Sequence, residues 1–189
     1  MTTVTVVIVV VVLLLLAAAL LVPRMRSRRL QQHFGPEYDR TVDTAGDRRA
    51  AERDLEERER ERKDLEIRAL DPGARSAYSR RWRTVQEQFV DSPDRAVGDA
   101  DVLVEEVMRE RGYPVGDFEQ QARVVSVDHA DVAAEYHAAH EISLRNQRGE
   151  ASTEQLREAM VHYRTLFAEL LDDGDSASGR SDSRNQPAQ

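Results

Sequence analysis

The stretch that decides the fold is DPGARSAYSRRWRTVQEQF, at residues 71–89. Asp71 and Pro72 form a helix start signal, because aspartate caps a helix N-terminus and proline suits the first helical position. The apolar residues that follow recur every three or four positions, as on one helical face: Ala74, Tyr78, Trp82, Val85 and Phe89. This spacing predicts an amphipathic helix that packs its stripe into a core.

Similar signals divide the rest of residues 71–171 into helices. Ser92 and Pro93 repeat the start signal, and RGYP at 111–114 predicts a helix end with Gly112 in a left-handed cap. The stretch 115–131 is less regular, because VVSV within it could be a short extended connector. We expect a break at 126–128, with Asp128 capping the next helix.

The last predicted helix has the most continuous apolar face, and it starts at a capping-box pattern formed by Ser152 and Gln155. Residues 71–171 therefore predict an antiparallel bundle of about four helices. The segment 172–189 has no apolar side chain larger than alanine. It cannot bury enough surface to offset its chain entropy, and this composition predicts a disordered tail.

The segment 34–70 precedes the bundle and is highly charged. Two helical turns between Leu55 and Leu65 contain no apolar residue, whereas a coiled coil needs a sustained apolar seam. We therefore predict a solvated helical stalk, with Leu65, Ile67 and Leu70 docking at its far end. A coiled-coil dimer is the alternative.

The N-terminal run Thr3–Val22 is uncharged and contains neither proline nor glycine. At about 1.5 Å per residue it would span roughly 30 Å, the thickness of the hydrocarbon layer. This predicts a transmembrane anchor at residues 1–23. A cleaved signal peptide is the alternative, and AAA at 17–19 could supply its cleavage site, but the basic start of such a peptide is missing.

A basic juxtamembrane segment, residues 24–33, follows the run and carries Arg24, Arg26, Arg28 and Arg29. Basic residues are retained on the cytoplasmic side, so we expect the N-terminus outside and the C-terminal domain in the cytoplasm. The same arginines would contact the membrane surface, where each contributes about 1 kcal/mol of attraction to anionic headgroups. Specific lipid binding is their alternative role. A secreted or envelope-facing location is the alternative topology.

Composition excludes several classes of function. The chain of 189 residues has no cysteine, so disulfides and thiolate metal sites are ruled out. Its net charge is −8, and the region beyond the arginine cluster is acidic, which argues against nucleic-acid binding. It contains neither a phosphate-binding glycine loop nor a nucleophile elbow.

Two candidate sites remain. His137 and His140 lie one turn apart and Glu141 follows, so a helical face could present metal ligands. The alternative is a purely structural role for these residues. Trp82 and Arg81 could anchor a partner if the indole is exposed, because both residue types are enriched at interface hot spots. A place in the core is the alternative for Trp82.

Four runs of the sequence carry a resemblance: RRLQQHFGPEYDRTV at 28–42, the run at 82–114, SVDHADV at 126–132 and REAMVHYRTLFAELL at 157–171. They resemble a family of uncharacterised bacterial proteins common in high-GC Gram-positive genomes, whose members are described as membrane or secreted proteins. The resemblance implies a bacterial source and a membrane-anchored module. It implies no activity, cofactor or catalytic residue.

Together these features predict a single-pass membrane protein that acts as a helical interaction or scaffolding module, without catalytic activity or a cofactor. Its expected partners are the lipid bilayer and an unknown protein, and homo-oligomerisation is left open. The alternatives are an exported envelope protein and a metal-binding helical enzyme that uses His137, His140 and Glu141.

Overall fold

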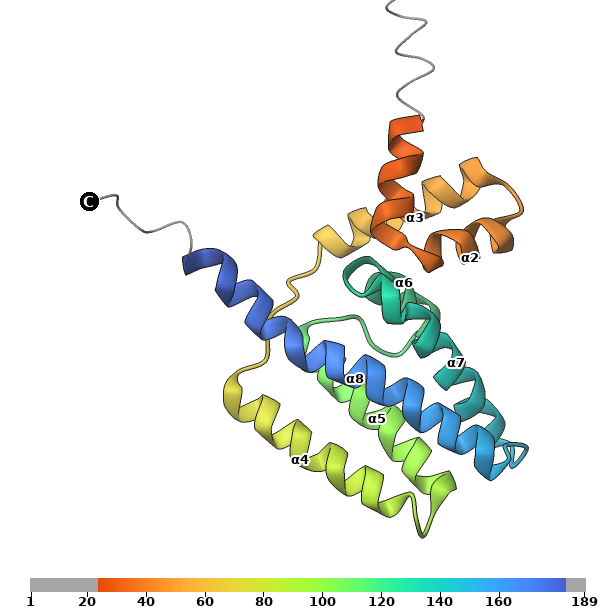
Figure 1. Ribbon diagram of the computed structural model, residues 1–189, viewed down its shortest axis with the longest axis vertical. Helices are drawn as coiled ribbons and strands as arrows, with labels where there is room; N and C mark the ends of the chain where they lie inside the picture. Colours follow the sequence, from red (N-terminus) through yellow and green to blue (C-terminus); the bar gives the residue numbers. More distant parts are fainter. Residues whose placement is uncertain (1–23, 183–189) are drawn as a thin grey trace, which may run out of the picture. The chain divides into compact units, whose positions relative to one another are not determined.

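The computed structural model describes residues 24–182, and every regular element in this range is a helix (Figure 1). The expected all-α class is therefore confirmed. The predicted anchor, residues 1–23, lies outside the described residues. Within the described part of the chain, no helix is both long enough and apolar enough to cross a bilayer. The chain divides into two compact units, Met1–Glu56 and Glu57–Gln189.

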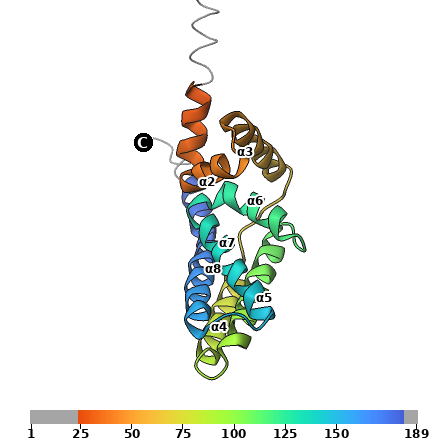
Figure 2. The same cartoon turned by 90° about the vertical axis from the view of Figure 1, so that its right-hand side faces the viewer.

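The second unit contains the helical bundle. Its helices are α4 (Pro72–Gln88), α5 (Pro93–Arg111), α6 (Phe118–Asp128), α7 (Ala130–Gln147) and α8 (Thr153–Asp182). Helices α4 and α5 form one antiparallel pair and α7 and α8 another, as the two views in Figures 1 and 2 show. Helix α8 packs against both α5 and α7, while α6 packs against α7. The predicted bundle is thus present.

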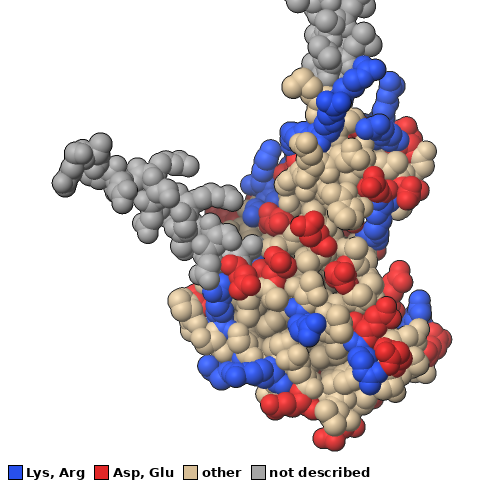
Figure 3. All heavy atoms as spheres, viewed as in Figure 1, with Lys and Arg blue, Asp and Glu red and all other residues tan. Residues whose placement is uncertain are grey.

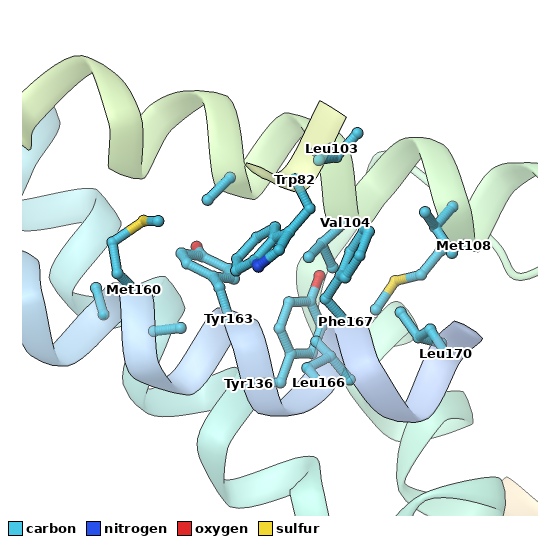
Figure 4. Close-up of a cluster of buried hydrophobic side chains, with 14 of the residues drawn as sticks. Trp82, Leu103, Val104, Met108, Tyr136, Met160, Tyr163, Leu166, Phe167 and Leu170 are labelled. Atoms are coloured by element: carbon cyan, nitrogen blue, oxygen red, sulfur yellow. The ribbon is translucent and has the colours of Figure 1, made fainter. Parts of the chain in front are cut away.

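The bundle core is closed by aromatic and aliphatic side chains from different helices (Figure 4). Trp82 of α4 stacks on Phe167 of α8, with ring centroids 4.7 Å apart. Leu103 and Met108 of α5 and Leu166 of α8 are fully buried beside them. Each such side chain contributes about 1.5–3 kcal/mol through burial. The stripe predicted from residues 71–89 is therefore a core face.

The predicted helix ends are confirmed at three places. The Asp71 carboxylate accepts hydrogen bonds from the N–H groups of Gly73 at 2.8 Å and Ala74 at 3.0 Å. Gly112 ends α5 with φ of 96°, a left-handed conformation. The capping box also forms, because the Ser152 N–H donates to the Gln155 side chain and the Gln155 N–H donates to the Ser152 hydroxyl.

The bundle differs from the expectation at its middle. The VVSV stretch is part of helix α6 and not an extended connector, so the described bundle has five helices where about four were predicted. Val124, Val125 and Ser126 are almost fully buried, and this burial overrides the strand preference of valine. The helix break comes at His129, and Asp128 does not cap α7.

The C-terminal segment also differs from the prediction. Helix α8 continues to Asp182, although disorder was predicted from residue 172. Adding a residue to an existing helix costs little compared with starting one, and this stretch contains no proline. Residues 183–189 lie outside the described part of the chain.

Much of the segment predicted as a stalk belongs to the first compact unit. Residues 24–34 form a helix, followed by α2 (Pro36–Ala45) and α3 (Arg48–Lys63), which contains the boundary between the units. Gly35 and Gly46, with φ of 47° and 65°, let the chain turn between these helices. The unit buries a set of apolar side chains, namely Leu30, Phe34, Tyr38, Ala51 and Leu55. The segment 34–70 is thus largely helical, as predicted, but it is not solvated throughout, because Tyr38, Ala51 and Leu55 are buried.

The last turns of α3 and the connector after them belong to the second unit. Here charged side chains take the place of the missing apolar ones, because Arg58 donates to Ser126 at 3.1 Å and Arg62 pairs with Asp128 at 2.5 Å. As predicted, the connector residues Leu65, Ile67 and Leu70 pack against the bundle core.

Candidate functional site

One cavity lined by described residues lies within the first unit. It has a volume of about 1120 Å³, is open to solvent, and lies between helix 24–34 and the first turns of α3. The lining is almost entirely polar and consists of Arg24, Arg26, Ser27, Arg28, Gln31, Asp47, Arg48, Arg49, Glu52 and Arg53. We refer to this cavity as the arginine pocket.

A buried carboxylate holds one side of the arginine pocket together. Oε1 of Glu52, a residue that is 8% exposed, accepts hydrogen bonds from the Ser27 hydroxyl, from Tyr38 Oη at 3.0 Å and from Arg48 Nε at 3.2 Å. Arg48 Nε also donates to Tyr38 Oη at 2.9 Å. This network joins helix 24–34, α2 and α3, so it positions Arg48 at the pocket wall.

The network also sets the ionisation of Glu52. Burial alone would raise the pKa of this carboxyl, but the hydrogen bonds from Ser27, Tyr38 and Arg48, together with the charge of Arg48, outweigh it. The pKa of Glu52 is therefore lower than its ordinary value. The carboxylate stays ionised at neutral pH and offsets only part of the surrounding positive charge.

The arginine pocket is strongly electropositive. Six arginines and two carboxylates line it. Glu56 pairs with Arg26 and Glu52 pairs with Arg48, but no carboxylate of the described residues pairs with Arg28, Arg49 or Arg53. In Figure 3, basic side chains gather around helix 24–34, whereas both signs alternate over the visible face of the bundle. The positive charge of this pocket is therefore local, because the chain as a whole has a net charge of −8.

The sequence analysis singled out three of the six arginines that line the pocket. Arg24, Arg26 and Arg28, which we expected at the membrane surface, line the pocket, and Arg29 is exposed outside its lining. Sequence reasoning missed Arg48, Arg49 and Arg53, because the prediction of a solvated helical stalk at 34–70 did not bring α3 back toward residue 24. The signal that could have revealed them is Gly46, whose left-handed conformation lets the chain turn back before α3.

The two histidines of the predicted metal site pack against an aromatic ring. The His140 ring stacks on Phe118 with centroids 3.6 Å apart, and the His137 ring meets the same phenyl ring edge-on at 5.2 Å. Glu141 is exposed and lies 3.9 Å from Arg145. Within the part of the chain that the structure describes, no group of three or more possible ligand side chains could hold a metal ion. The geometry does not bring His137, His140 and Glu141 together as ligands.

The predicted partner anchor at Trp82 required an exposed indole, but Trp82 is buried, with only 6% of the residue exposed. Its neighbour Arg81 pairs with Glu106 and lies over the Tyr78 ring, 5.6 Å from the centroid. Both residues therefore join α4 to the rest of the bundle. A different surface of α4 is open, a shallow groove of about 180 Å³ shared with α8 and lined by Gln86, Phe89, Arg157, Met160, Val161 and Arg164.

Polar groups inside the bundle also have structural partners. The Asp101 carboxylate accepts hydrogen bonds from Tyr163 Oη at 2.7 Å and from the Ser143 hydroxyl at 3.3 Å. Tyr136 donates to Gln121 Oε1 at 2.9 Å. Burial, followed by the charge of Asp101, raises the pKa of both tyrosines, so they remain donors at physiological pH. This layer locks four helices together.

Comparisons of the chain with protein-family models, with curated proteins and with solved structures each return no match. The class of this protein is therefore described by its fold and its candidate site alone. The described chain is an all-helical protein with a tightly packed bundle and, in a separate compact unit, a cavity lined by arginines.

Proposed function

We propose that this protein is a single-pass membrane protein whose helical domains lie on the cytoplasmic side and act as an interaction or scaffolding module without catalytic activity. One observation carries the proposal. In the sequence, an uncharged run long enough to span a bilayer is followed directly by Arg24, Arg26 and Arg28, and these three side chains are exposed. This order suits a retained anchor with its basic flank inside.

The expected mechanism is tethering. A domain attached to a membrane meets membrane-bound partners at a raised effective concentration, so even a weak contact becomes useful. The bundle offers surfaces for such a contact. Val161 is 45% exposed beside the groove between α4 and α8, and Arg157 and Arg164 flank this groove. A partner segment with apolar and acidic side chains would match it.

Membrane attachment and orientation can be tested together. Reporters active only in the cytosol or only after export would be fused to the C-terminus of the full chain, and membranes would be washed with alkaline carbonate. We expect cytosolic reporter activity and retention of the protein in the washed membranes. Activity of the export-dependent reporter would overturn the topology and favour an exported envelope protein. Release by carbonate would overturn the anchor.

The interaction surface needs a second test. A photo-crosslinking residue would replace Val161 in native membranes, and the matched control would replace Val102, which is 53% exposed on α5. We expect Val161 to give a discrete crosslinked product that an added Arg164→Glu substitution removes. Equal crosslinking from both positions would exclude the groove as a specific docking surface.

A further inference from the structure

We propose that the arginine pocket is a binding site for the phosphate-bearing headgroup of an anionic membrane lipid. The inference rests on the proposed membrane attachment, because only attachment brings a headgroup to this unit. It assigns a ligand to the unit that precedes the bundle. The argument uses the size of the pocket, its uncompensated charge and its place in the chain.

The size of the pocket fits a headgroup better than a single small ion. Small-molecule sites in proteins usually enclose about 300–1000 Å³. At about 1120 Å³ the arginine pocket, which is open to solvent, exceeds this range and has room for a headgroup. A lone inorganic phosphate would contact only one part of this wall.

The charge of the pocket selects an anion. Arginine binds phosphate oxygens through two parallel hydrogen bonds, which gives geometric specificity as well as attraction. Arg28 comes from helix 24–34, whereas Arg49 and Arg53 come from the first turns of α3. Because no carboxylate of the described residues pairs with these three guanidinium groups, they can turn toward a ligand without breaking an ion pair.

The wall of the pocket is held in place before any ligand binds. The hydrogen bonds of Glu52 with Ser27, Tyr38 and Arg48 connect the two helices that carry the arginines. A preformed site loses less side-chain entropy on binding than a set of free surface arginines. This distinguishes the arginine pocket from basic residues that only set topology.

The place of the pocket in the chain favours a lipid over a soluble phosphate compound. Arg24 and Arg26 line it and follow almost directly after the uncharged run that we propose as the anchor. A short chain distance from the membrane surface keeps these arginines near headgroups, where each contributes about 1 kcal/mol of attraction.

The test uses the full chain in phosphatidylcholine nanodiscs that contain a small fraction of cardiolipin, whose headgroup carries two phosphates. After extraction in mild detergent, native mass spectrometry measures how much cardiolipin stays with the protein. Arg28→Gln and Arg29→Gln form a matched pair, because both side chains are exposed on neighbouring positions of one helix and only Arg28 lines the pocket. We expect about fivefold less retained lipid for Arg28→Gln and unchanged retention for Arg29→Gln.

A triple variant strengthens the comparison. Arg28→Gln with Arg49→Gln and Arg53→Gln should abolish retention. Its control makes the same charge change outside the pocket, with Arg29→Gln, Arg80→Gln and Arg83→Gln. Circular dichroism would establish that both triple variants keep the helical content of the original chain. Equal retention by the two triple variants would show that only net charge matters and would overturn the site.

The outcomes separate this inference from the proposed function. If the chain does not enter the nanodiscs, the anchor fails and the inference fails with it. If the chain enters but Arg28→Gln and Arg29→Gln retain equal lipid, only the inference is overturned. In a further arm, inorganic phosphate or pyrophosphate is added in solution. Displacement of cardiolipin at matched concentration would assign the pocket to a soluble phosphate compound, and we expect no such displacement.

Discussion

Replacing Gly112 by alanine tests why the connector after α3 can pass the end of α5. Gly112 has φ of 96°, and a Cβ atom placed on it would lie 2.6 Å from the carbonyl oxygen of Glu66. The connector also depends on this approach, because the Arg68 N–H donates to the Arg111 carbonyl at 2.9 Å. The atoms nearest to this Cβ position belong to the backbone of Glu66, so they cannot move aside as a flexible side chain would.

The expected loss of stability has two parts. A left-handed conformation costs a residue with a Cβ about 1–2 kcal/mol. Forcing extra volume into a packed region costs about 1–3 kcal/mol more. Gly112→Ala should therefore lower the free energy of unfolding by about 2–5 kcal/mol, a large part of the roughly 5–15 kcal/mol that stabilises a typical domain.

Two other glycines separate these parts. Gly149 has φ of 71° but open space around its Cβ position, so Gly149→Ala should cost only the conformational part, about 1–2 kcal/mol. Gly98 lies inside α5 with open space, and Gly98→Ala should stabilise the protein by about 0.5–1 kcal/mol. Guanidinium unfolding of the full chain in detergent, followed by far-ultraviolet circular dichroism, measures all three. Equal losses for Gly112→Ala and Gly149→Ala would refute the close-approach argument.

Three further substitutions test the described contacts. The folded-state pKa of Glu52 is lowered, so its ionised form stabilises the fold above the ordinary carboxyl pKa, and this stabilisation is lost as the pH falls through the folded-state pKa. The difference in unfolding free energy between the original chain and Glu52→Gln, measured by denaturant unfolding, should therefore shrink toward acid pH. A difference that stays constant with pH would exclude the network. Trp82→Ala should cost about 3–5 kcal/mol by circular dichroism, because the indole fills the core against Phe167, and a loss below 1 kcal/mol would mean that the indole is not buried. Tyr163→Phe should cost about 1–3 kcal/mol, because it removes a hydrogen-bond donor to Asp101; an unchanged unfolding midpoint would contradict this hydrogen bond.

Local sequence patterns predicted much of the bundle because its strongest signals act over short distances. The cap at Asp71, the capping box at Ser152 and the left-handed end at Gly112 each depend on a few neighbouring residues. The apolar residues of α4 recur at helical spacing, and this spacing predicts which face of the helix is buried. The VVSV stretch misled the prediction, because its helical state depends on burial by residues distant in the sequence.

The arginine pocket could be predicted only in part. Arg24, Arg26 and Arg28 stood out because they follow an uncharged run. Their approach to Arg48 and Arg53 depends on two turns of the chain and on a hydrogen-bond network around one buried carboxylate. Charged residues carry no periodic signal for such a fold, so a solvated stalk was the natural expectation for this segment.

By itself the sequence determined the helical class, the faces that form the bundle core and the positions of most helix ends. These follow from the 3.6-residue period and from caps that act within one turn. Only the tertiary structure decided that Trp82 is a core residue, that His137 and His140 pack on Phe118, and that arginines from separate helices line one pocket. Such outcomes depend on which distant residues meet, and burial and charge pairing settle this only once the chain is folded.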